Sequence, residues 1–78
     1  MDLNELAIDL GKKLEVGDRQ KIVDITGINK NTVYAILQGK TLNHMSKDKV
    51  MQVINEAIDI IKSREKEIKK VMDKAKGL

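Results

Sequence analysis

The chain has 78 residues, a mass of 8.8 kDa and a formal net charge of +3. This length accommodates a single domain, the absence of cysteine excludes disulfides, and one histidine without any thiol does not make a structural zinc site. No apolar run approaches the roughly 20 residues of a membrane span, and the acidic start has the wrong sign for a secretory signal. We therefore expect a soluble cytoplasmic protein that needs no metal or cofactor.

The charge is distributed unevenly along the chain. Residues 1–18 carry a net charge of −3, from two basic and five acidic residues. Residues 19–49 carry a net charge of +4, from six basic and two acidic residues. Residues 62–78 also carry +4, from seven basic and three acidic residues. Two separate basic segments of this kind favour a polyanionic partner.

The absence of proline and the high content of charged and apolar residues predict an all-α fold. A first helix is expected over residues 3–14, with Asp2 as its cap and one apolar face at helical spacing. The segment 15–17 interrupts the pattern, and Asp18 is then expected to cap a second helix over residues 19–25.

A tight turn is expected at residues 26–29, because Gly27 tolerates the left-handed backbone that ends a helix and Asn29 can cap the next one. A third helix is expected over residues 30–38, ended by Gly39. The two short helices are expected to share a small core made of Ile22, Ile25, Ile28, Val33, Ile36 and Leu37.

Ser46 is expected to cap a long helix over residues 47–75, after a loop at residues 40–45 in which His44 has a structural or solvent-exposed role. The chain then divides into a head, residues 1–45, and a long C-terminal helix, residues 46–78. The first half of that helix is apolar over about half its circumference, and its second half keeps a narrower stripe. A head of this size cannot cover roughly 43 Å of helix, so a second copy is expected on Ile61, Ile68, Val71, Met72 and Ala75. Parallel, antiparallel and splayed pairings all remain open.

The spacing around Gly27 resembles the helix-turn-helix DNA-binding heads of lambda-repressor-like and lac-repressor-like transcription factors. The resemblance is close over residues 19–39 and looser over residues 40–57. Aliphatic residues stand at the family's positions, five before and one, six and nine after the glycine. Val23 departs from the family, which usually has alanine where the two helices cross, so a slightly wider crossing is expected. The residues that carry the resemblance are Gly27, Ile22, Val23, Ile28, Val33 and Ile36.

The resemblance implies that the second helix of the motif lies in the major groove of double-stranded DNA. Base reading is then expected from Lys30, Asn31 and Ala35, with Thr32 and Tyr34 as the next candidates. Lysine can donate to guanine, asparagine can pair with adenine, and the alanine methyl can pack on the methyl of thymine. Phosphate contacts are expected from Arg19, Gln20, Gln38 and Lys40.

Two functions follow from these expectations. The first is a sequence-specific transcriptional regulator, with repression as its expected activity, which acts as a homodimer on half-sites about 34 Å apart. The alternative is an oligomeric assembly or adaptor protein, such as a small-terminase-like subunit of a viral DNA-packaging machine, in which the long helix is the main functional element. No nucleophile–base pair or phosphate-binding loop can be recognised, so an enzyme is not expected.

Overall fold

Four helices make up most of the part of the chain that the computed structural model describes, residues 2–40 and 46–77. They are α1 (Leu3–Lys13), α2 (Asp18–Thr26), α3 (Lys30–Leu37) and α4 (Lys47–Lys76). The all-α fold with a long last helix is therefore confirmed, and each helix boundary lies within one residue of its expected position. None of the helices in these two ranges is long and apolar enough to cross a membrane. Most of the expected loop, residues 41–45 including His44, lies outside the described residues.

Two of the four helices, α1 and α3, have an N-terminal residue whose side chain caps the first turn. The carboxylate of Asp2 accepts a hydrogen bond from the Glu5 amide at 2.8 Å, and the side chain of Asn29 accepts one from the Asn31 amide at 2.8 Å. Ser46 takes the N-cap position of α4 as expected, but its hydroxyl makes no capping hydrogen bond. The residues of that first turn are exposed, so water can satisfy the free amides there.

The turn between α2 and α3 has the expected chemistry. Gly27 has a φ of 72°, in the left-handed region, and its amide donates to the Val23 carbonyl at 2.8 Å. Thr26 holds the turn from both sides, because its hydroxyl donates to the Ile22 carbonyl and accepts from the Ile28 amide. Local hydrogen bonds in the turn therefore determine the direction in which α3 begins, independently of long-range packing.

The end of α3 is fixed in a similar way. The amide of Gly39 donates to the Ile36 carbonyl and that of Lys40 to the Ala35 carbonyl, which is the pairing of a Schellman motif. Gly39 has a φ of 74°, and a Cβ at this position would lie 2.8 Å from Cδ1 of Ile8. The left-handed backbone therefore requires glycine, and an added Cβ would in addition have to displace the end of the Ile8 side chain.

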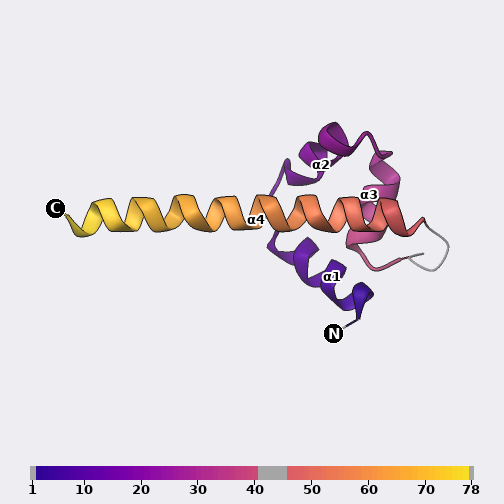
Figure 1. Cartoon of the computed structure of the whole chain (residues 1–78), viewed down its shortest axis with the longest axis horizontal. Coiled ribbons are helices and arrows are strands. Elements are labelled where there is room, and N and C mark those ends of the chain that lie inside the picture. The colour runs from indigo at the N-terminus through magenta and orange to yellow at the C-terminus, as the bar shows by residue number, and fades with distance from the viewer. Residues whose placement is uncertain (1, 41–45, 78) are drawn as a thin grey trace.

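The core lies where α1, α2, α3 and the first half of α4 meet (Figure 1). Among the expected core residues, Ile25 is wrong, because 61% of it is exposed. Ile25 lies at the edge of the contact between α2 and α4, where it lines an open depression together with Lys21 and Ile60, so much of its side chain stays exposed. The buried apolar residues are Ala7, Leu10, Leu14, Ile22, Ile28, Val33, Ile36, Leu37, Val50, Val53, Ile54 and Ala57.

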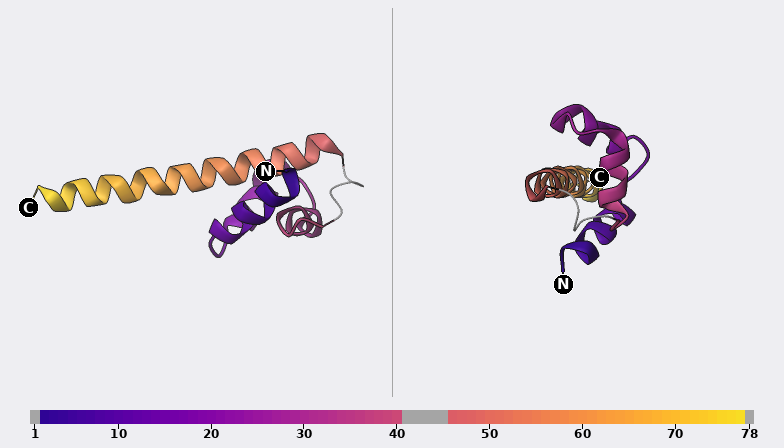
Figure 2. Two further views of the ribbon diagram at one scale, coloured as in Figure 1. Left: turned by 90° about the horizontal axis from the view of Figure 1, so that it is seen from below. Right: turned by 90° about the vertical axis from the view of Figure 1, so that its right-hand side faces the viewer.

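The long helix α4 has one half on the head and one half beyond it. Its N-terminal half packs on the three short helices, whereas its C-terminal half extends alone away from them, giving an elongated molecule of 52 × 28 × 18 Å (Figures 1 and 2). Ile68, Val71 and Met72 on the free half are 54%, 66% and 56% exposed. Ile61, which was also expected on the dimer face, is partly buried against the head.

Candidate nucleic-acid interface

The outward face of α3 is the centre of the candidate interface. Its buried face consists of Val33, Ile36 and Leu37. At 100° per residue, the opposite direction is centred on Asn31 and Ala35. Asn31 is exposed and Ala35 is half-buried, so a long polar side chain and a small apolar one stand together on this face.

Lys30, Tyr34 and Gln38 form a row beside that centre, because they recur at intervals of four. The Lys30 ammonium lies 5.6 Å from the centroid of the Tyr34 ring, within cation–π range. All three side chains are exposed to solvent, whereas Thr32, on the other flank of the same face, is half-buried.

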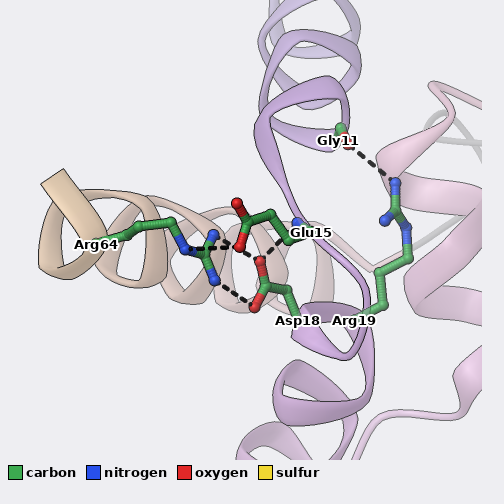
Figure 3. Close-up of polar contacts among 5 residues, drawn as sticks. All are labelled: Gly11, Glu15, Asp18, Arg19 and Arg64. Carbon is green, nitrogen blue, oxygen red and sulfur yellow. Dashed lines mark hydrogen bonds and ion pairs between the residues drawn. The ribbon is translucent and has the colours of Figure 1, made fainter. Parts of the chain in front are cut away.

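Arg19 connects α2 to this row. Its guanidinium carbon lies 5.6 Å from the centroid of the Tyr34 ring, and one of its terminal nitrogens donates to the Gly11 carbonyl at 3.0 Å (Figure 3). A guanidinium has five N–H donors, so this bond leaves capacity for an anion. Arg19, Tyr34 and Gln38 also line a shallow depression of about 420 Å³ at the C-terminal end of α1.

The other expected phosphate contacts are less uniform. The Gln20 amide donates to the Asp24 carboxylate at 3.0 Å, so that side chain is already engaged beside a negative charge. Lys40 is exposed just after the end of α3. The structure thus brings Arg19, Lys30, Tyr34 and Gln38 together, and it gives Gln20 the least suitable surroundings for a phosphate.

A cluster of charged side chains, which the sequence did not predict, joins the start of α2 to α4. It consists of Glu15, Asp18 and Arg64. Asp18 is 1% exposed, and its carboxylate accepts from two guanidinium nitrogens of Arg64, at 2.8 and 2.9 Å (Figure 3). It also accepts from the Glu15 amide at 2.7 Å, while the Glu15 carboxylate lies 3.1 Å from Arg64 Nε. Asp18 was expected to cap α2, and that interpretation is wrong: Gly17 takes the N-cap position, and the Asp18 carboxylate turns back to the preceding loop.

The electrostatics of this cluster favour the charged carboxylate. The hydrogen bond from Arg64 lowers the pKa of Asp18 below its usual value, although burial works in the opposite direction. The bond to Asp18 raises the pKa of Arg64 in turn. Asp18 directly precedes Arg19, so the cluster anchors the turn of α2 from which the Arg19 side chain extends.

The structural role of Gly11 was also not predicted, although the sequence indicates it. A glycine inside an amphipathic helix often marks a close approach of another backbone. Gly11 is buried, and a Cβ there would lie 2.6 Å from the Leu37 carbonyl oxygen. The pairing of Asp18 with Arg64 had no comparable signal, since 46 residues separate the two.

Within the described residues, no group of three or more histidine, cysteine, aspartate or glutamate side chains is arranged to hold a metal ion. Comparison of the chain with protein-family models, with curated proteins and with solved structures found no match.

Proposed function

We propose that the chain is a sequence-specific double-stranded DNA-binding protein that regulates transcription, most simply as a repressor, and acts as a homodimer. The observation that carries the proposal is the outward face of α3. It presents Asn31 at its centre and Lys30 in its first turn, and the Gly27 turn and the buried face of α3 hold both in place.

The chemistry of this face suits the major groove, which is wide enough to admit a helix. In the proposed complex, Asn31 pairs with the Hoogsteen edge of an adenine, and Lys30 donates to the O6 and N7 atoms of a guanine. The half-buried Ala35 brings its methyl group against the methyl of a thymine, and Thr32 and Tyr34 contact neighbouring bases or sugars.

Phosphate contacts surround the reading residues in this proposal. Arg19 is preorganised by the Gly11 carbonyl and the Tyr34 ring, so a phosphate bound there requires little further ordering of its side chain. Lys40 and Gln38 lie at the opposite end of α3 from Lys30, so contacts at both ends of the helix orient it along the groove. We place Gln20 last among the phosphate contacts because its amide already bonds Asp24.

Fluorescence anisotropy with labelled duplexes tests the proposal. Affinity for random duplex is expected to fall as salt rises, because phosphate contacts release counterions. Once a preferred sequence has been selected, Asn31→Ala and Lys30→Ala are each expected to reduce discrimination between bases by about 1–3 kcal/mol. Lys40→Ala serves as the matched control, since it should weaken all sequences alike. A salt slope near zero, or identical behaviour of the three variants, contradicts the proposal.

The assembly alternative is favoured by one observation, the length of α4 beyond the head. If that half is the main functional element, chains associate into a ring and contact DNA weakly or not at all. Sedimentation velocity separates the two functions: a dimer supports regulation, and a ring of eight or more chains supports assembly.

A further inference from the structure

The exposed apolar stripe on the free half of α4 continues the face that the head covers. The buried residues Val50, Val53, Ile54 and Ala57 and the exposed residues of the stripe project in the same direction at 100° per residue. A second helix laid on the stripe therefore lies on the same side of α4 as the head, directly beyond its base.

This shared direction decides the polarity of a symmetric pair. In a parallel pair, both heads would have to fit into the gap between the two N-terminal halves of α4, where the helix axes are only about 8–10 Å apart. In an antiparallel pair, the second helix occupies the stripe, and its own head lies beyond the C-terminal end of the first chain. We propose that a second copy of this chain covers the stripe, with the two C-terminal halves of α4 antiparallel and the two-fold axis between Lys69 and Lys70.

The charges beside the stripe select this register. Ile68 of one copy lies opposite Val71 of the other, and the two symmetry-related contacts form the centre of the pair. On one flank, Glu67 then faces Lys74 of the second copy, twice by symmetry, at the flanking positions where charges set helix orientation. Arg64, which is held by Asp18, faces the small Ala75 of the second copy.

Neighbouring registers lack this complementarity. Sliding one helix along the other by seven residues in one direction places Lys74 opposite Lys74 of the second copy, and sliding it in the other direction places Glu67 opposite Glu67. Both alternatives bring like charges together. In the proposed register, the tip of the second helix reaches a depression of about 330 Å³ at the junction with the head, lined by Lys13, Ile61, Arg64, Glu65 and Ile68.

The pairing has a consequence for DNA reading, which rests on the proposed function. The head contacts α4 around residues 53–54, which lie 16 residues from the two-fold axis. At 1.5 Å per residue, each head is about 24 Å from the axis, so the two heads are about 48 Å apart along the helices. Half-sites one helical turn apart would require about 34 Å. Preferred half-sites are therefore expected to be more widely spaced than one turn.

A charge exchange tests the register. Glu67→Lys and Lys74→Glu are each expected to weaken the dimer severalfold in sedimentation equilibrium, and the double variant to restore it, because the exchanged charges meet again only across an antiparallel pair. Lys66 and Asp73 are also seven residues apart and lie on the opposite face of α4, so Lys66→Asp with Asp73→Lys is the matched control and should leave association unchanged. Failure of the double variant to restore the dimer overturns the register.

A distance measurement tests the polarity. The chain has no cysteine, so Asp48→Cys, at the exposed start of α4, allows a single spin label on each copy. Pulsed electron paramagnetic resonance is expected to give about 65 Å between the labels of an antiparallel dimer at 1.5 Å per residue. A much shorter distance, or a chain that stays monomeric at millimolar concentration, overturns the pairing. Neither readout involves DNA, so failure here is distinguishable from failure of the proposed DNA binding.

Discussion

Asp18→Asn provides a sharp test of how the head is held on α4. One oxygen of the Asp18 carboxylate accepts from Arg64 and from the Glu15 amide, and the other accepts from the second guanidinium nitrogen. Asparagine keeps one acceptor and places an amide NH₂ against the remaining Arg64 donor. At least one charge-assisted bond to a 1% exposed side chain is therefore lost, and each such bond is worth about 1.5–3 kcal/mol.

We therefore expect Asp18→Asn to lower the free energy of unfolding by about 2 kcal/mol and the Tm by about 8–16 °C for a domain of this size. Thermal and urea unfolding followed by circular dichroism at 222 nm, at one fixed protein concentration, measure both quantities. Asp9→Asn, on the exposed side of α1, is the matched control. A loss below about 0.5 kcal/mol, the level of an ordinary surface substitution, would refute the inferred role of the Asp18–Arg64 contact.

The same pair predicts the direction of a pH effect. The pKa of Asp18 is lowered in the folded chain, so its stabilising contribution is fully present above the unfolded-state pKa of about 3.9. The contribution is lost as the pH falls through the lower folded-state value. The difference in stability between the wild type and Asp18→Asn should therefore be constant near neutral pH and shrink below about pH 4. A difference that instead grows as the solution is acidified would mean that the sign of the shift is wrong.

Three further outcomes are expected. Gly11→Ala should destabilise the fold by about 1–3 kcal/mol in urea unfolding, because its Cβ would lie 2.6 Å from the Leu37 carbonyl oxygen; Lys12→Ala, one residue further on the exposed face, is its control. Gly27→Ala should cost about 1–2 kcal/mol from the left-handed backbone alone, since nothing lies within 4 Å of the added carbon; a loss as large as that of a buried leucine truncation would point to an unseen contact. Val71→Asp should abolish dimer formation in sedimentation equilibrium while leaving the melting of dilute monomer unchanged, and a dimer that survives it must use another surface.

The features that sequence reasoning predicted well are determined by near neighbours. The Asp2 and Asn29 caps, the left-handed Gly27 and the end of α3 at Gly39 all depend on contacts within about one helical turn. Such contacts are readable because the partner lies a fixed number of residues away.

The features that it missed depend on how the helices are rotated and paired. Ile25 satisfied an apolar pattern, yet it lies at the open edge of the contact between α2 and α4, where 61% of it stays exposed. Arg64 is a charged residue in line with the apolar residues of α4, and it is the partner of a buried carboxylate 46 residues earlier in the chain. No local pattern encodes that pairing.

The contact between α3 and a DNA duplex can be tested most directly by a titration of ¹⁵N-labelled chain with a selected duplex, followed by amide chemical shifts. We expect the largest chemical-shift changes at residues 29–35 and smaller ones at Arg19 and Lys40, while the shifts of buried residues such as Val53 stay unchanged. No change on addition of duplex, or changes confined to the lysines at residues 62–76, would contradict this contact.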